Sequence, residues 1–245
     1  MLKWFSNRKE KACEVLDFSV LKTDIHSHFI PGIDDGAPDM ETSIALIKKM
    51  QELGYSKVIT SPHVMSDFYQ NSSETILKGL ADVRAELKAQ NINMEIDAAA
   101  EYYIDYEFEQ KIGTEKFLTF GNNYILVELS FMEAPRNLFD IIFKLQLEGY
   151  KVVLAHPERY GYYKQEDYDN FTNRGVLLQI NLLALIGHYS TSIQKKTEQL
   201  IANNQVSFVG TDCHNMMHAE LYEQCQIKKS WYDLVNSGML LNNTL

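Results

Sequence analysis

The chain has 245 residues, of which 45% are hydrophobic, and its formal net charge is −10. This length suits one large domain or two small ones, and the hydrophobic fraction is ample for a buried core. The acidic balance argues against a protein that binds nucleic acid, because such a protein presents a basic face to the phosphates. The excess carboxylates fit either a solvated acidic surface or a site that holds cations.

The cysteines are few, and no two of them form the Cys-x-x-Cys pair of a zinc ribbon or a thioredoxin-like site. They are Cys13, Cys213 and Cys225. A low cysteine count fits a reducing compartment. The chain starts without the apolar run of a signal peptide, and no stretch reaches the roughly 18 apolar residues of a membrane span. We therefore expect a cytoplasmic protein with no transmembrane segment.

Short runs of β-branched and aliphatic residues predict buried parallel strands. In chain order they are "VLKTDIH" (20–26), "KVITSPH" (57–63), "MEIDAAAE" (94–101), "YILVELS" (124–130), "KVVLAHPE" (151–158), "VLLQINL" (176–182) and "VSFVGTD" (206–212). Amphipathic stretches at 39–54, 72–90, 137–149 and 191–204 predict helices between them. This alternation indicates an α/β fold with a parallel sheet.

Residue types that bind metal ions stand at the carboxyl ends of these runs, except for the sixth, which ends in Asn181 and breaks the pattern. They are His26 and His28, His63, Glu101, Glu128, His156, and Asp212 with His214. In a closed (β/α) barrel all strands open on one face, so these positions would meet there. An open sheet would spread them along a line. We therefore favour a barrel that carries a metal site.

The spacing within two runs supports this interpretation. Residues two apart on a strand share a face, so His26 and His28 can bind one ion together, and Asp212 and His214 repeat the arrangement. Asp24 has the same parity and is expected to orient a histidine. Histidine and carboxylate without thiolate suit Mn, Fe or Zn better than Ca. More than four ligands imply more than one ion, with a bridging carboxylate.

Any single histidine at a strand end is more often a hydrogen-bonded structural residue than a ligand, so the prediction depends on the whole set. His188 and His218 fall outside the strands, and we interpret both as structural.

The stretches "DIHSHFIPGIDDG", "TSPH", "AAEYY", "LVEL", "AHPERY" and "GTDCHN" run from Asp24 to Asn215. Together they resemble the PHP-domain (polymerase and histidinol phosphatase) family. Within it they are similar to the bacterial manganese-dependent protein-tyrosine phosphatases of capsular and exopolysaccharide operons, the CpsB/YwqE type. The resemblance implies a distorted seven-stranded, TIM-barrel-like (β/α) barrel. It would form one phosphatase domain over residues 1–245, with 1–19 as an N-terminal extension.

The resemblance also implies three divalent ions, Mn²⁺ foremost, with Fe, Mg or Zn as alternatives. The first ion would be held by His26, His28, Glu101 and Asp212, the second by Glu101, Glu128 and His156, and the third by Asp35, His63 and His214. Asp35, rather than its neighbour Asp34, matches the motif because it directly precedes Gly36. Arg159 would clamp phosphate through its planar guanidinium. The expected catalytic residues are Arg159, Asp212 and His214.

The implied activity is hydrolysis of phosphotyrosine on proteins by a metal-activated hydroxide. The implied substrate is the tail of a tyrosine kinase that controls polysaccharide synthesis. The thiol route requires Cys-x₅-Arg, but the residues six beyond the cysteines are Ser19, Ala219 and Trp231. Relatives tend to carry an arginine shortly after the "DCHN" motif, where this chain has His218.

Eight aromatic residues follow the strand ends and either line a cleft for a phosphotyrosine ring or pack the loops. They are Tyr102, Tyr103, Tyr106, Phe108, Phe131, Tyr160, Tyr162 and Tyr163. The basic start of the chain, with Trp4 and Phe5, is expected to pack as a helix, with contact to an anionic membrane as the alternative.

Other activities stay open on the sequence alone. They are a small-molecule PHP phosphatase of the histidinol-phosphate type, another phosphoesterase such as a PHP nuclease, an amidohydrolase, and a non-catalytic scaffold subunit. A homo-oligomer is compatible with the sequence.

Overall fold

The computed structural model describes residues 15–245. The N-terminal extension was predicted to pack as a helix or to contact a membrane. Residues 1–14 of that extension lie outside the described residues. The strands are β1 (Thr23–Asp24), β2 (Lys57–Thr60), β3 (His63–Val64), β4 (Glu95–Ala98), β5 (Glu101–Tyr103), β6 (Tyr124–Glu128), β7 (Lys151–Ala155), β8 (Leu177–Asn181) and β9 (Val206–Gly210).

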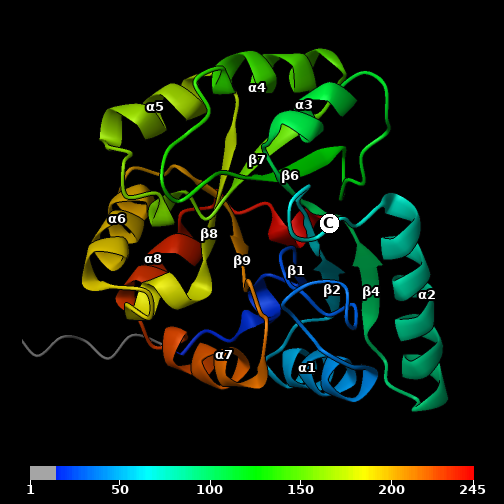
Figure 1. The fold of residues 1–245 in the computed structure, drawn as a ribbon. Helices are drawn as coiled ribbons and strands as arrows, with labels where there is room; N and C mark the ends of the chain where they lie inside the picture. Colours follow the sequence, from blue (N-terminus) through cyan, green and yellow to red (C-terminus); the bar gives the residue numbers. More distant parts are fainter. Residues whose placement is uncertain (1–14) are drawn as a thin grey trace, which may run out of the picture.

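Helices follow most of the strands and surround them (Figure 1). The α-helices are α1 (Met40–Glu52), α2 (Ser73–Ala89), α3 (Tyr106–Lys111), α4 (Leu138–Leu147), α5 (Gln165–Asn173), α6 (Thr191–Ala202), α7 (Met216–Leu221) and α8 (Lys229–Asn236). Short 3₁₀ turns are η1 (Phe18–Val20), η2 (Pro157–Arg159), η3 (Leu182–Ile186), η4 (Tyr222–Cys225) and η5 (Asn242–Thr244). The four helices predicted from amphipathic stretches are confirmed as α1, α2, α4 and α6.

Local chemistry sets the helix ends. The side chain of Asp39 accepts a hydrogen bond from the backbone N–H of Thr42 and so caps α1. Ser72 and Thr75 form a reciprocal capping box at the start of α2. After α1 the chain turns at Gly54, whose φ of +103° favours glycine. A side chain there would also meet the backbone nitrogen of Ser19 at 2.9 Å.

All strand pairs are parallel, which confirms the predicted α/β class. One sheet has the order β1-β2-β4 and the other the order β3-β5-β6-β7-β8-β9. Among the described residues, the strand pairing assigns these two sheets and does not close them into the single seven-stranded barrel that we expected. The prediction of the closed barrel is therefore only partly met.

The predicted strands 57–63 and 94–101 are each split in two, and a proline accounts for the break in the first. "KVITSPH" becomes β2 and β3, separated by Ser61 and Pro62, because proline has no N–H to donate to a neighbouring strand. The register nevertheless continues across the break: Thr60 pairs with Ala98, and His63 pairs with Glu101. The two sheets are thus continuous at this edge.

The amino ends of the strands lie against apolar residues, whereas polar residues lie at the carboxyl ends. A buried apolar cluster inside the sheets includes Ile59, Leu126, Val153 and Phe208, and Leu245 at the C-terminus packs against it. The C-terminus lies beside β1 and β2 (Figure 1). The terminal segment therefore covers the amino ends of the strands, and the polar residues lie at the carboxyl ends.

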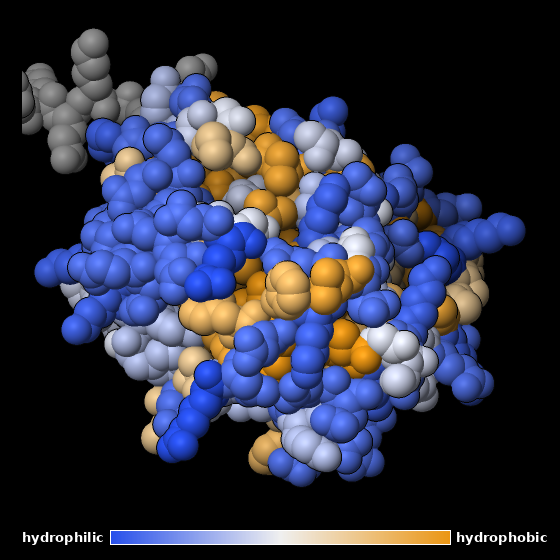
Figure 2. Space-filling model, turned by 90° about the horizontal axis from the view of Figure 1, so that it is seen from above, coloured by the Kyte–Doolittle hydropathy of each residue, from blue (hydrophilic) through white to orange (hydrophobic). Residues whose placement is uncertain are grey.

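The outer surface is mostly hydrophilic, with hydrophobic side chains gathered in the middle of the face seen in Figure 2. On α4, Phe143 and Leu147 are exposed. Between residues 15 and 245 we find no helix with the length and apolarity to cross a bilayer.

Candidate metal centre

The nine predicted ligands meet at the carboxyl ends of the strands. They come from the loops after β1, β7 and β9, from the starts of β3 and β5, from the end of β6, and from the loop before α1. The nine are His26, His28, Asp35, His63, Glu101, Glu128, His156, Asp212 and His214. In each, a histidine nitrogen or a carboxylate oxygen lies within 3.7 Å of a carboxylate oxygen or histidine nitrogen of another member.

Glu101 lies at the centre of this cluster and is fully buried. Its Oε2 is 3.1 Å from Nε2 of His26 and 3.1 Å from Nδ1 of His63. Nε2 of His28 lies 3.6 Å from the same oxygen, and Nε2 of His156 lies 3.0 Å from Oε1. One carboxylate therefore touches four histidines from three separate segments, as a carboxylate that bridges ions would.

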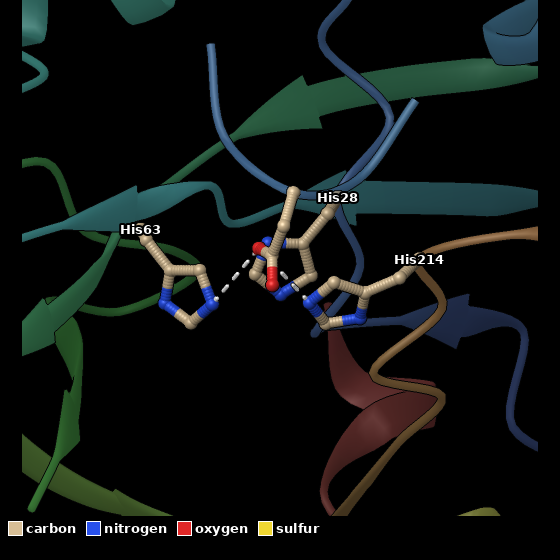
Figure 3. A group of neighbouring side chains, drawn as sticks. His28, His63 and His214 are labelled. Carbon is tan, nitrogen blue, oxygen red and sulfur yellow. Dashed lines mark ion pairs between the residues drawn. The ribbon is translucent and has the colours of Figure 1, made fainter. Parts of the chain in front are cut away.

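A second carboxylate, Asp35, joins the outer part of the cluster. Its Oδ1 is 3.5 Å from Nε2 of His63 and 3.5 Å from Nε2 of His214. Figure 3 shows His63 and His214 facing this carboxylate from opposite sides, with His28 behind it. The side chain of Asp35 is 53% exposed, so the cluster runs from buried Glu101 to solvent at Asp35.

The donor set fits divalent metal ions. Three groups of residues each offer ligand atoms within 4.8 Å of one another: His28, Asp35, His63 and His214; His26, His28 and Glu101; and His63, Glu101 and Glu128. The buried atoms Nε2 of His26, Nε2 of His28, Nδ1 of His63 and Oε2 of Glu101 have no hydrogen-bond partner within the described chain. Buried polar atoms are normally satisfied, so their convergence indicates a ligand between them.

These groups overlap the expected ligand sets without matching them fully. The group that contains Asp35, His63 and His214 also includes His28. The group that contains Glu101 and Glu128 is completed by His63, where His156 was expected. His156 still touches both carboxylates, at 3.0 Å from Glu101 and 3.5 Å from Glu128.

The clustered side chains shift one another's pKa values. Burial lowers the pKa of His26, but the charges of Glu101 and Asp212 together with the ring's hydrogen bonds outweigh burial and raise that pKa to about 9. The same balance raises the pKa of His63 to about 10. Burial raises the pKa of Glu128 to about 8, with repulsion from Glu101 adding to it. The cluster therefore favours bound protons, whose positive charge divalent cations would replace.

The backbone is strained where two of these residues leave their strands. His156 has a φ of +35° and Asp212 a φ of +53°, both in the left-handed region that side chains other than glycine rarely adopt. Such strain concentrates at functional sites, where the surrounding structure maintains it. Here it turns each side chain toward the cluster directly after a strand.

Hydrogen bonds behind the histidines orient their rings. Nδ1 of His28 lies 2.8 Å from Oδ2 of Asp34, and Nδ1 of His214 lies 2.9 Å from the carbonyl of Asp212. Each contact leaves Nε2 facing the cluster. Asp34, which the motif comparison set aside in favour of Asp35, thus orients a histidine from behind.

The expected orienting role of Asp24 takes a different form. Its carboxylate accepts hydrogen bonds from the backbone N–H and the hydroxyl of Thr211, at 3.0 and 2.8 Å, and from the backbone N–H of His26, at 3.5 Å. The ring of His26 is instead held by Gln179 on β8. Gln179 was not among the residues predicted for the site, and Asn181 stood only as a break in the pattern, although both have the same parity in "QIN" and contact ligands of the cluster.

Arg159 extends over the cluster from η2. Its Nη1 is 3.2 Å from Oδ2 of Asp212, and its guanidinium lies 4.6 Å from the ring centre of Phe131 and 4.7 Å from that of Tyr189. Stacking between two rings keeps the planar donor fork in place.

The other aromatic residues predicted to line a cleft or pack the loops differ in burial. Tyr102, Phe108 and Tyr160 are buried, and Tyr106 is exposed on α3. Phe131 is 46% exposed and stacks on both His156 and Arg159. It is thus an aromatic side chain beside the cluster that a substrate ring can reach. The remaining members, Tyr103, Tyr162 and Tyr163, are half-buried.

His188 and His218 lie near the cluster rather than in an unrelated part of the fold. The ring centre of His218 is 6.0 Å from that of His214 and 5.4 Å from that of His188. A structural role for both residues stays a prediction.

The cysteines of the described chain are unsuited to nucleophilic attack. Cys213 and Cys225 are buried, and burial raises the pKa of each thiol to about 12. Thiolate, the reactive form, is therefore scarce near neutral pH.

Comparison with known proteins identifies relatives that match most of the chain. The model of a capsular polysaccharide synthesis family, CpsB/CapC, matches residues 22–232. The tyrosine-protein phosphatase YwqE of Bacillus subtilis is 28% identical over 208 residues, which cover 82% of this chain and 80% of that protein. The putative tyrosine-protein phosphatase CapC of Staphylococcus aureus is 24% identical over 232 residues, which cover 90% and 91%.

A solved structure agrees with these sequence matches. It comes from crystallographic work on YwqE from Bacillus subtilis and CpsB from Streptococcus pneumoniae, described as metal-dependent tyrosine phosphatases. It superposes with a TM-score of 0.79 at 26% identity and covers 91% of this chain and 90% of its own. The chain therefore belongs to the CpsB/CapC family of capsular polysaccharide synthesis proteins.

Proposed function

We propose that this protein is a metal-dependent phosphatase that removes phosphate from tyrosine residues of proteins. The observation that carries the proposal is the position of Glu101, a buried carboxylate contacted by nitrogens of four histidines, with the donor fork of Arg159 nearby. The relatives named as tyrosine phosphatases support the substrate class.

Three divalent ions, with Mn²⁺ as the first choice, would be held by the nine clustered residues. Glu101 would be shared between two ions, and Asp35 with His63 and His214 would hold the outermost one. The ligands are histidine and carboxylate without thiolate, a set that suits Mn, Fe or Zn. Bound ions would supply a water of lowered pKa and positive charge for the phosphoryl oxygens.

The protein's own groups would bind and orient the phosphate. Arg159 would donate two parallel hydrogen bonds to phosphoryl oxygens, because its guanidinium is planar and already held between two rings. Asp212 keeps the guanidinium over the cluster through its contact with Nη1. Phosphoryl transfer depends mainly on such positioning and charge neutralisation, so it requires no cysteine.

Phe131 would distinguish phosphotyrosine from smaller phosphate esters. Its ring is half-exposed and lies against Arg159, next to where the phosphate would bind. A phosphotyrosine ring can stack there, whereas a phosphoserine side chain is too short to provide an aromatic face.

The proposal also covers how the two sheets are arranged and where the protein meets its substrate. We infer that the two sheets act as one distorted seven-stranded barrel in a single domain. A parallel bridge between Ser27 and Cys213 and the hydrogen bond from Asp212 N–H to the carbonyl of His26, at 2.7 Å, support this arrangement. The substrate would be a tyrosine kinase of polysaccharide synthesis, encountered in the cytoplasm.

A substrate panel tests the proposal. Metal-stripped protein is reloaded with Mn²⁺, Fe²⁺, Mg²⁺ or Zn²⁺ and assayed on a phosphotyrosyl peptide, the matching phosphoseryl peptide and histidinol phosphate. We expect kcat/KM to be highest for the phosphotyrosyl peptide. A preference for histidinol phosphate would assign the protein to the small-molecule phosphatases instead.

A further inference from the structure

We propose that Gln179 and Asn181 form an amide relay that presets His26 and Asp212 to bind one metal ion. The relay is the chain of hydrogen bonds that runs from His26 through Gln179 and Asn181 to Asp212. This inference rests on the proposed function, because it assigns the two amides a positioning role in the metal centre.

The relay is continuous in the structure. Nδ1 of His26 lies 2.8 Å from Oε1 of Gln179, and Nε2 of Gln179 donates to Oδ1 of Asn181 at 2.9 Å. Nδ2 of Asn181 then donates to Oδ2 of Asp212 at 2.6 Å. At the other end, Nε2 of His26 lies 3.5 Å from Oδ1 of Asp212. The relay thus links His26 and Asp212 through the two amides, while the same two side chains also face each other directly across the ion site.

The count of donors and acceptors permits one orientation of each amide. Asp212 is an ionised carboxylate and can only accept, so the amino group of Asn181 must face it. The second N–H of that amino group goes to the hydroxyl of Tyr189 at 3.1 Å. The two N–H bonds of Gln179 go to Asn181 and to the carbonyl of Ile180, at 2.8 Å. Turning either amide around would place N–H against N–H or oxygen against oxygen.

This fixed orientation determines which nitrogen of His26 carries a proton. Oε1 of Gln179 can only accept, so Nδ1 of His26 must donate. Nε2 is the nitrogen left to bind an ion, and it faces Glu101 and Asp212. The relay therefore links the carboxylate of Asp212 to the ring of His26: Nδ1 keeps its proton toward Gln179, and Nε2 is directed at the ion site.

Burial and close packing make the relay rigid. Gln179, Asn181 and His26 are fully buried, and Asp212 is 4% exposed. Gly210 on the neighbouring strand β9 leaves room for the contact between His26 and Gln179. A Cβ there would lie 2.6 Å from Cβ of His26 and 2.8 Å from Nε2 of Gln179. Only glycine allows the two side chains to approach this closely.

The experiment is a double-mutant cycle on Mn²⁺ binding. The variants are Gln179→Met, Asn181→Leu and the double variant, which keep side-chain size and remove the hydrogen bonds. The dissociation constant for Mn²⁺ is measured by competition with a chelator, and melting curves check the fold. We expect each single variant to bind the ion of this site about ten- to a hundredfold more weakly, a typical effect of losing an orienting partner. The double variant should lose no more than the worse single variant, because the relay acts as one unit.

A spectroscopic readout separates positioning from packing. In Zn²⁺-loaded protein, the Nδ1 proton of His26 should be protected from exchange and lose that protection in Gln179→Met. Gln194→Met is the matched control, since that side chain also bonds to a backbone carbonyl, at 2.9 Å, but lies outside the relay. It should leave Mn²⁺ affinity unchanged.

Three outcomes would count against the inference. Folded single variants that bind Mn²⁺ within twofold of the parent would overturn the relay and leave the proposed function standing. Losses that add in the double variant would show two independent contacts instead of a relay. A parent protein that binds no Mn²⁺, Fe²⁺ or Zn²⁺ would overturn the proposed function and the relay together.

Discussion

Arg159 and Asp212 are joined by a contact of 3.2 Å between Nη1 and Oδ2, so the guanidinium of the phosphate clamp is tied to a carboxylate of the metal cluster. The same oxygen of Asp212 also accepts from Asn181, at 2.6 Å. Asp212 therefore keeps a hydrogen-bond donor even when Arg159 is removed. Phosphate recognition and metal assembly can thus be separated by mutation.

Replacing Arg159 with alanine should weaken catalysis and leave the metal content intact. A charge-assisted hydrogen bond contributes roughly 1.5–3 kcal/mol, so kcat/KM on a phosphotyrosyl peptide should fall by about ten- to a hundredfold. Arg159→Lys should recover little, because an ammonium keeps the charge and loses the planar fork. Steady-state kinetics with parallel elemental analysis provides the check.

Arg174→Ala is the matched control for that variant. The guanidinium of Arg174 also stacks on an aromatic ring, that of Phe139 at 4.6 Å, but it lies at the end of α5 away from the cluster. Its removal should leave kcat/KM unchanged. If the Arg159→Ala protein stays within twofold of the parent, phosphate is held without the guanidinium.

Phe131 should affect substrate binding more than metal binding. Phe131→Leu removes the ring that stacks on Arg159 and would receive the substrate ring, so KM for the phosphotyrosyl peptide should rise by about three- to tenfold. Phe131→Tyr should restore the parent value because it keeps the aromatic face. Phe68→Leu serves as control, since Phe68 is 77% exposed and belongs to a different loop. Equal KM values for parent and Phe131→Leu would remove this side chain from the binding site.

The stability of metal-free protein should fall as pH rises above neutrality. The pKa of His26 is raised to about 9 and that of His63 to about 10, so the stabilisation from their protonated forms is complete below about 6.5, the pKa of an unfolded histidine. It is lost as pH rises through 9 and 10. The raised pKa of Glu128, about 8, acts in the same direction, because ionising this carboxyl in the folded state is unfavourable.

Urea unfolding at pH 7 and pH 9, with and without Mn²⁺, measures this effect. The free energy of unfolding should drop between these pH values in metal-free protein and drop less in loaded protein, where bound cations replace the lost protons. Metal-free stability that is constant or rises from pH 7 to pH 9 would show that these groups are not protonated in the cluster.

Much of the site was predictable because strand-end residues of a parallel sheet converge wherever the strands pair in sequence order. Glu101 and His156 are far apart in the chain, yet the residue types at the ends of "MEIDAAAE" and "KVVLAHPE" were enough to predict that they meet. The α/β class followed from the alternation of strands and helices. Pro62 was visible in "KVITSPH", but its effect, splitting the strand without shifting the register, depends on the pairing of His63 with Glu101.

The supporting residues were less predictable because their role depends on which partner the fold places beside them. Gln179 and Asn181 received no role from the sequence because amides are uncommon metal ligands, and their role requires His26 and Asp212 at hydrogen-bond distance. Asp24 was expected to contact a histidine from its parity alone, but the nearest donors belong to Thr211.

The most direct test of the account is a metal titration of turnover. Protein stripped by chelation, with metal absence confirmed by elemental analysis, is titrated with Mn²⁺ while hydrolysis of a phosphotyrosyl peptide is followed. Glu101→Gln is carried through the same titration. The account predicts no turnover without metal, recovery with Mn²⁺ in the parent, and little recovery in the variant, because the shared carboxylate would serve two ions. Full turnover in stripped protein, or a Glu101→Gln protein that binds Mn²⁺ and works like the parent, would contradict it.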